Sequence, residues 1–363
     1  MGVTYKFELT PSIVRYLQTI ERVRETVRLT MLPPAVAEVL RLQANIRSTH
    51  YSTLIEGNRL TLKETEMVVQ QGRQFPGRER DVQEVQRYYQ ALQLMEKWVE
   101  GEKKITEERV RKLHAILYSG RRARPTPYRD GQNIIRENSG QIVYMPPEAV
   151  DVPSLMKELV AWVHKTSKDM PIPVVAGVAH YQFETIHPFF DGNGRTGRML
   201  TTWILYKASY DLGKFFALEE FYAQDLQGYY DALVTHPNRN YYFGRNEADI
   251  TSWLDYFLRG MAVVFERVSE QIRSEIIEDI DQEALALLRS LDHRARRVLG
   301  LFSTQELVRS FDVANLLGIS VRQTRDLLTG WVADGWLEVA DPSKRGRKYR
   351  LAEEYRVLLN QRW

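Results

Sequence analysis

The segment His187-Pro188-Phe189-Phe190-Asp191-Gly192-Asn193-Gly194-Arg195-Thr196-Gly197-Arg198 lies between two stretches whose apolar residues recur at helical spacing. It is therefore expected to form a tight loop that leads into the N-terminus of a helix. Glycines at 192 and 194 allow backbone N–H groups to point toward an anion, and the helix adds the positive end of its dipole. The segment predicts an anion-binding loop.

The side chains of this segment are suited to phosphate chemistry. Arg195 and Arg198 are three residues apart, hence on one face of the helix, and both can reach the same anion. Asp191 offers the hard oxygen that Mg²⁺ prefers beside phosphates, and His187 titrates near neutrality. We expect His187 to deprotonate a hydroxyl that attacks a phosphorus atom held by the loop and the metal.

Three other interpretations of glycine-rich segments in this chain compete with an anion-binding loop of this kind. Gly192–Gly197 matches the dinucleotide-binding pattern GxGxxG, but that pattern follows a strand, and a helical stretch precedes it here. Gly72 and Gly77 are spaced as in a Walker A loop, but Arg78 and Glu79 stand where Lys and Ser or Thr are needed. A plain helix cap with exposed arginines explains any one part of the segment but not all twelve residues.

His187–Arg198 resembles the signature HxFx(D/E)GNGRxxR of Fic (Fido) domain proteins at every defined position. The resemblance implies an all-helical core, ATP as co-substrate with Mg²⁺, and transfer of AMP to a Ser, Thr or Tyr hydroxyl of a target protein or of the chain itself. The implied roles are a base, His187; a metal ligand, Asp191; a loop anchor, Phe189; and phosphate ligands, Gly192, Asn193, Gly194, Arg195 and Arg198.

A β-hairpin is predicted between Pro125 and Pro147, where glycines and prolines separate two β-prone runs with a turn near 138–140. It resembles the Fic flap, which implies that an extended target segment pairs with it; an ordinary hairpin over the core is the alternative. The docking residues implied are Ile134, Ile135, Val143 and Tyr144. Tyr229 and Tyr230 resemble family tyrosines near the adenine, although core packing explains such pairs equally well.

A second motif lies at Tyr51–Asn58. Ser52 and Glu56 are four residues apart on one helical face, and Gly57 is suited to end the helix. A carboxylate near a helix C-terminus opposes the helix dipole and favours a cationic partner. The segment resembles the inhibitory motif (S/T)xxxE(G/N) of Fic proteins, which implies that Glu56 pairs with Arg198 and blocks a reactive pose of ATP.

The last third of the chain predicts a small separate domain. Three helices are expected at Ser303–Arg309, Val313–Leu317 and Ser320–Asp334, and two strands at Trp336–Val339 and Lys348–Leu351. This order is typical of a winged helix, which binds DNA or serves as a protein-contact or homodimer module. The candidate DNA contacts are Arg322, Gln323, Arg325, Lys344, Arg345, Arg347 and Lys348.

Composition adds limits. The 363 residues are 44% hydrophobic and 27% charged, with a net charge of +3 and no cysteine, so disulfides and thiolate metal sites are excluded. No signal peptide or membrane span is recognised, and a cytoplasmic protein is expected.

We therefore expect a mainly α protein with a Fic helical core, a β-hairpin flap and a C-terminal winged helix. The expected domains are an N-terminal helical region with the inhibitory motif (1–110), the core (111–265), and a linker helix with the winged helix (266–363). The expected function is a protein adenylyltransferase restrained by Glu56. Removal of AMP by the same site and a DNA-binding regulator with an accessory Fic site stay as alternatives.

Overall fold

The computed structural model describes residues 5–30, 32, 34–120, 123–136, 142–279, 287–288, 290–303, 305–341, 343 and 346–360. The chain divides into two compact units. The first comprises Met1–Met31 and Ala37–Glu270, and the second comprises Leu32–Val36 and Gln271–Trp363. The expected boundary at residue 110 falls inside helix α5 (Glu107–Ser119).

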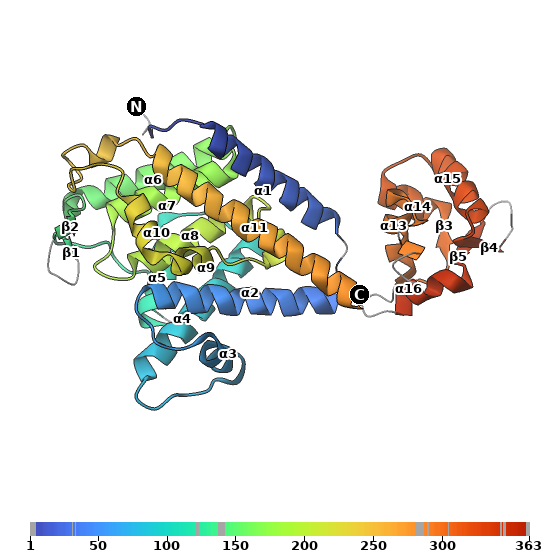
Figure 1. Cartoon of the computed structure of the whole chain (residues 1–363), viewed down its shortest axis with the longest axis horizontal. Helices are drawn as coiled ribbons and strands as arrows, with labels where there is room; N and C mark the ends of the chain where they lie inside the picture. Colours follow the sequence, from blue (N-terminus) through green and yellow to red (C-terminus); the bar gives the residue numbers. More distant parts are fainter. Residues whose placement is uncertain are drawn as a thin grey trace. The chain divides into compact units, whose positions relative to one another are not determined.

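Two helices form the centre of the first unit. α7 (Ile172–Ile186) is buried along almost its whole length, and α8 (Asn193–Lys207) packs against it over an extensive contact. A helix that is apolar on all sides is expected in the middle of a helical core. α5, α6 (Val152–Thr166) and α4 (Glu79–Glu100) pack around this pair (Figure 1).

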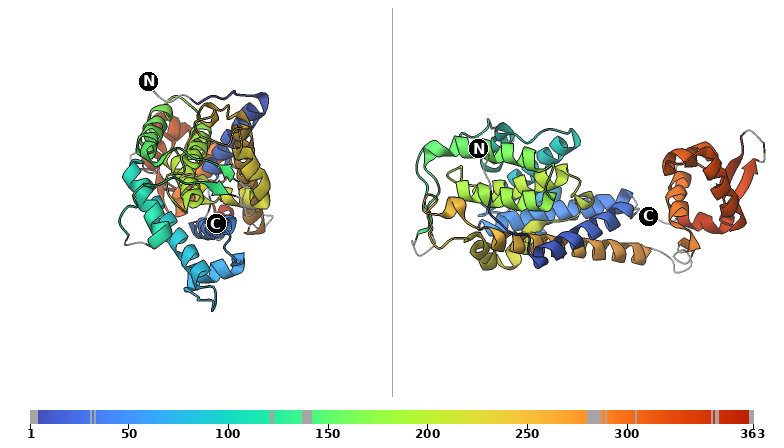
Figure 2. Two further views of the ribbon diagram at one scale, coloured as in Figure 1. Left: turned by 90° about the vertical axis from the view of Figure 1, so that its left-hand side faces the viewer. Right: turned by 90° about the horizontal axis from the view of Figure 1, so that it is seen from above.

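The N-terminal helices enclose the central pair. α1 (Pro11–Leu29) starts at Thr10, whose hydroxyl caps the helix, and lies beside α11 (Thr251–Asp279), to which an Arg22–Glu266 ion pair of 2.9 Å joins it (Figure 2). α2 (Pro34–Ile55) leads to α3 (Leu62–Gln71), which has a capping box at Thr61 and Glu64. The apolar spacing predicts helices over 13–31, 36–53 and 61–70, and all three are present with ends shifted by one or two residues.

The predicted hairpin is present but short. β1 (Ile135–Arg136) pairs antiparallel with β2 (Ile142–Tyr144), and the predicted turn near 138–140 lies outside the described residues. Met145 continues β2 and pairs in parallel with Asn240. The remaining elements of this unit are the 3-10 helices Ala149–Asp151, Leu212–Lys214 and Arg245–Glu247 and the helices α9 (Leu218–Gln224) and α10 (Leu226–Leu233). The sequence predicts helices over 194–210 and 226–235 in this region, and α9, which lies between these ranges, was not predicted.

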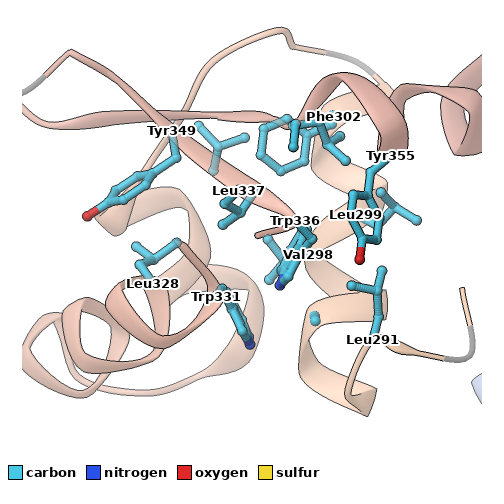
Figure 3. Close-up of a cluster of buried hydrophobic side chains, with 14 of the residues drawn as sticks. Leu291, Val298, Leu299, Phe302, Leu328, Trp331, Trp336, Leu337, Tyr349 and Tyr355 are labelled. Carbon is cyan, nitrogen blue, oxygen red and sulfur yellow. The ribbon is translucent and has the colours of Figure 1, made fainter. Parts of the chain in front are cut away.

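The second unit contains helices and a small sheet around its own core (Figure 3). α14 (Ser310–Leu317) and α15 (Val321–Ala333) agree with the prediction, and β4 (Leu337–Asp341) and β5 (Lys348–Leu351) are the two expected strands. β5 is the central strand of an antiparallel sheet with the order β3-β5-β4. The core includes Val298, Leu328, Trp331, Trp336 and Tyr349.

The prediction of a helix at Ser303–Arg309 was wrong. A helix lies before this segment instead, at α13 (His293–Leu299), where Asp292 accepts hydrogen bonds from the N–H groups of Arg294 and Ala295 as an N-cap. Val308–Arg309 instead forms the strand β3, which pairs with β5. Further short elements of this unit are the 3-10 helices Gly300–Ser303 and Glu353–Arg356 and the helix α16 (Val357–Asn360).

Candidate active site

The candidate base stands where α7 ends. His187 is the C-cap residue, with φ 50° and ψ 61°, a left-handed conformation that few non-glycine residues adopt. Its Nδ1 is buried, so only Nε2 is left to reach a substrate. Burial lowers the pKa of His187 to about 4, which keeps the imidazole neutral at pH 7.

Asn193 holds the loop that follows His187. Its side-chain oxygen accepts a hydrogen bond from the N–H of Phe189 at 2.9 Å, and its amide donates to the carbonyl of Phe189 at 2.8 Å. Both polar groups of this buried side chain are thus used inside the loop. Of the phosphate contacts expected for Asn193, only one through the backbone N–H is left.

Phe189 anchors the same loop, as expected, because its ring is buried. It stacks on the imidazole of His114 from α5, with ring centroids 3.7 Å apart. His114 Nε2 lies 2.7 Å from the carbonyl oxygen of Asp191, and Nδ1 lies 2.9 Å from the Thr126 hydroxyl. Burial lowers the pKa of His114, so α5 supports the loop with a neutral ring.

The start of α8 has the features of an anion site. Gly192 is its N-cap, with φ 76°, and Thr196 folds its hydroxyl back onto the Gly192 carbonyl at 2.8 Å. A Cβ atom at Gly194 would overlap with a carboxylate oxygen of Glu56, so a carboxylate already stands against the first turn of this helix. An anion at this place is stabilised by free N–H groups and by the helix dipole.

Asp191 is suited to a metal that arrives with phosphates. Its side chain is 56% exposed, lies 3.7 Å from Arg195 and accepts one bond from the Gly192 N–H at 2.6 Å. In the part of the chain that the structure describes, no three His, Asp or Glu side chains converge on a metal-sized site. One carboxylate completed by substrate oxygens fits Mg²⁺, which keeps few protein ligands.

Arg198 makes the predicted ion pair with Glu56. Its guanidinium lies 2.8 Å from the Glu56 carboxylate, and the side chain of Arg198 is only 2% exposed. Arg198 also donates to the hydroxyl and to the carbonyl of Ser52, both at 2.9 Å. Gly57 follows with φ 92°, a conformation that glycine adopts without strain. The end of α2 thus binds Arg198 through three acceptors.

Glu184 is a further carboxyl group in this region. One of its oxygens is buried without a hydrogen-bond partner, and burial raises the pKa of Glu184 to about 8. It therefore stays protonated at pH 7 and adds no negative charge beside Arg198.

The hairpin and the two tyrosines agree with the prediction only in part. Ile134, Ile135 and Val143 are half-buried, whereas Tyr144 is buried and its hydroxyl donates to the Thr185 carbonyl at 2.8 Å. The side chain of Tyr144 packs toward α7, which leaves its backbone as the part suited to pair with an extended target segment. Tyr229 is also buried, 2.8 Å from His180, whereas Tyr230 is 45% exposed. Tyr230 is left as the candidate for an adenine contact.

His114 and Arg129 were not predicted as site residues. Their partners lie 77 and 58 residues away in sequence, at Asp191 and His187. His114 had one local signal, because it lies at i+4 from Val110 on the buried face of α5. A polar side chain on such a face needs a buried partner.

Comparisons with known proteins point to one family. Residues 104–205 match the model of the Fic/DOC family. A curated "Protein adenylyltransferase Fic" from Drosophila ananassae is 26% identical over 199 residues, which cover 54% of this chain and 39% of that protein. The protein of the same name from Nematostella vectensis is 27% identical over 172 residues, 46% of this chain and 39% of that protein. The match thus spans about two fifths of each relative.

Solved structures show the same fold. A Fic family protein from Desulfovibrio desulfuricans G20 aligns with a TM-score of 0.61 and 27% identity over 96% of this chain and 98% of that chain. Fic-1 (aa134–508) from C. elegans aligns with a TM-score of 0.57 and 18% identity over 72% of this chain and 73% of that chain.

Proposed function

Because residues 104–205 form a Fic/DOC domain, we propose that the chain is a protein adenylyltransferase, which transfers AMP from ATP to a hydroxyl side chain of a target protein. One observation carries the proposal. The neutral imidazole of His187, the exposed carboxylate of Asp191 and the buried guanidinium of Arg198 surround the start of α8. The carboxylate of Glu56 occupies an anion position there. The names of the relatives support the same activity.

In this proposal His187 is the general base. Its low pKa keeps Nε2 free to take the proton of the attacking hydroxyl. The hydroxyl oxygen then forms a bond to the α-phosphorus, and the bond from that phosphorus to the bridging oxygen of the leaving pyrophosphate breaks. Magnesium bound to Asp191 would neutralise phosphate charge.

The first turn of α8 holds the phosphates. The N–H groups of Asn193 and Gly194 and the side chain of Arg195 supply donors on one side of the loop. Arg198 is buried one turn further along the helix and is suited to the terminal phosphate.

Glu56 restrains this activity. Its carboxylate takes the guanidinium of Arg198 that the terminal phosphate requires, and Ser52 holds the same guanidinium from the preceding turn. ATP would then bind in a pose in which the α-phosphorus is not in line for attack.

The experiment uses ATP labelled at the α- or the γ-phosphate with the Glu56→Gly variant. Label from the α-phosphate on protein, and none from the γ-phosphate, is expected. The matched control is the double variant Glu56→Gly with His187→Ala, which keeps the nucleotide site but lacks the base. Transfer of γ-label indicates kinase-like chemistry, and the absence of both labels from the chain and from a lysate used as substrate contradicts the proposal.

A second candidate function, binding of duplex DNA, belongs to the second unit. Arg322 and Arg325 are both exposed, three residues apart in the first turns of α15, and Arg347 is exposed before β5. Gln323 is less suited to read bases, because its oxygen accepts hydrogen bonds from Ser320 in the helix cap. Lys344 and Arg345, also expected to contact DNA, lie outside the described residues.

A titration of the full chain with duplex DNA over a range of salt tests this candidate. The slope of log K against log salt is expected to fall by about 1 for each phosphate contact removed by Arg322→Ala or Arg325→Ala. Arg350→Ala is the matched control, because Arg350 is exposed but already paired with Glu338 at 2.8 Å. Affinity that does not depend on salt contradicts phosphate contact.

A further inference from the structure

Arg129 is a buried cation with an unusual set of partners. It is 3% exposed, and the hydrogen bonds that its guanidinium donates to described residues all go to backbone carbonyls. These carbonyls belong to Gly131 at 3.0 Å, His187 at 3.0 Å, Ile186 at 3.5 Å, and Pro147. Among the described residues no carboxylate lies within ion-pair distance of Arg129, so ordinary charge pairing does not explain its burial.

Two of these acceptors lie at the end of α7. The last carbonyls of a helix have no partner within the helix, and they form the negative end of its dipole. Arg129 binds the carbonyls of Ile186 and His187 there, and its own N–H donates to the carbonyl of Pro188 at 3.0 Å. The end of α7 thus supplies the negative charge density that a buried guanidinium requires.

The other two acceptors lie at the two ends of the hairpin. Gly131 directly precedes the described hairpin residues 132–136, and Pro147 directly follows residues 142–146. We call Gly131 and Pro147 the feet of the hairpin. One guanidinium therefore joins both feet to each other and to the backbone of the residue that carries the candidate base.

We propose that Arg129 is a positioning residue that holds the hairpin and His187 in one fixed geometry. The proposal rests on the transferase function proposed above, in which the hairpin presents the target segment and His187 deprotonates the hydroxyl of that segment. The reaction needs the hydroxyl and Nε2 within hydrogen-bond reach, and a misplacement of about 1 Å costs about 100-fold in rate. The described residues of the two hairpin strands number two and three, and so short a pairing does not supply this rigidity by itself.

Arg129 also stabilises the backbone of His187. A residue other than glycine keeps a left-handed backbone conformation only where surrounding contacts stabilise it. The carbonyl of His187 accepts from Arg129 Nε, and the next carbonyl accepts from the Arg129 N–H. The Arg129 side chain thus fixes the position of the His187 backbone, which carries the imidazole, and the position of the hairpin.

The experiment places Arg129→Lys and Arg129→Gln in the full-length Glu56→Gly variant. Lysine keeps the charge but cannot bridge both feet and α7 with one planar group, and glutamine keeps a donor without charge. Arg245→Lys is the matched control, because Arg245 is buried and lies over the rings of Tyr144 and Tyr181, 5.1 and 4.9 Å from their centroids. The measurements are hydrogen exchange of peptides from 132–136 and 142–146, binding of Mg-ATP, and AMP incorporation from α-labelled ATP at saturation.

For Arg129→Lys we expect exchange in both hairpin peptides to accelerate about 10-fold or more. Incorporation should fall about 100-fold, while the dissociation constant of ATP changes less than about 2-fold. Arg129→Gln should show larger effects, and Arg245→Lys should leave exchange in the peptide 132–136 unchanged.

Unchanged exchange in Arg129→Lys, or a lysine variant that unfolds as a whole, overturns the proposal, because the role would then be absent or one of general stability. If the Glu56→Gly parent itself incorporates no AMP, the proposed transferase function fails. The exchange rates still decide in that case whether Arg129 ties the hairpin to α7.

Discussion

Removal of the Glu56 carboxylate is expected to raise the activity, because it frees the guanidinium of Arg198. Glu56→Gly deletes the ion pair with Arg198, and Glu56→Gln keeps the size of the side chain and one neutral acceptor. Arg198 is 2% exposed and Glu56 25% exposed, so the pair is shielded from solvent on one side only. Arg198 also keeps its two bonds to Ser52 after either change. We therefore place the contribution of the pair at about 1–3 kcal/mol, below that of a fully buried pair.

A coupling of about 1–3 kcal/mol corresponds to a factor of about 5–150 in the population of the reactive pose. AMP incorporation from α-labelled ATP should rise by that factor in Glu56→Gly and by less in Glu56→Gln. The melting temperature should fall in both, by about 2–4 °C for each kcal/mol lost. Intact-mass analysis over time measures the first effect, and thermal unfolding measures the second.

Glu25→Gln is the matched control, because Glu25 forms an exposed pair with Arg28 on α1 at 2.6 Å. It should alter neither incorporation nor the melting temperature, since exposed pairs contribute little. If folded Glu56→Gly and Glu56→Gln both incorporate AMP at the rate of the unmodified chain, the proposed restraint is refuted.

Three further predictions concern the same site. Ser52→Ala should raise incorporation by less than Glu56→Gly, because it removes one of three acceptors on Arg198; an effect equal to that of Glu56→Gly would contradict this. His114→Ala, made with Glu56→Gly, should lower incorporation about 10-fold or more through loss of the Phe189 stack, with Tyr118→Ala as an exposed control on the same helix. Folding lowers the pKa of His187 to about 4, so the unfolded chain binds a proton below about pH 6.5 that the folded chain does not. The free energy of unfolding should therefore fall by up to about 1.4 kcal/mol per pH unit below about pH 6.5. Denaturant unfolding at pH 7, 6 and 5 measures this, and a constant free energy of unfolding would contradict it.

Features with a local cause could be predicted from the sequence. The sequence predicts helices over Glu107–Ser119 and Val152–Thr166, and α5 and α6 have these bounds because caps, prolines and apolar spacing act within a few residues. The ion pair between Glu56 and Arg198 joins residues 142 positions apart, yet it was expected, because both segments resemble motifs of one family. The spacing of Glu56 and Arg198 in the sequence does not by itself indicate that their side chains are in contact.

Features that depend on distant partners could not be predicted. Val308–Arg309 is a strand only because β5 offers hydrogen bonds to it, and its own residues also suit a helix. Tyr144 faces inward because Thr185 offers an acceptor, whereas three residues of β2 are too few to show which face is buried. Arg129 belongs to the same class, because its four carbonyl partners carry no signal in their side chains.

The geometry of the proposed restraint by Glu56 also predicts which kinetic constant it changes. Glu56 bonds to Arg198, and in the described part of the chain it makes no hydrogen bond or ion pair with Arg195 or Asp191. Most donors for a Mg-ATP complex therefore stay available while Glu56 is in place, and only the contact with the terminal phosphate is lost. Glu56→Gly should then raise the incorporation rate at saturating ATP far more than it lowers the dissociation constant of ATP. A large gain in ATP affinity with no change in that rate would mean that Glu56 excludes the nucleotide rather than misplacing it.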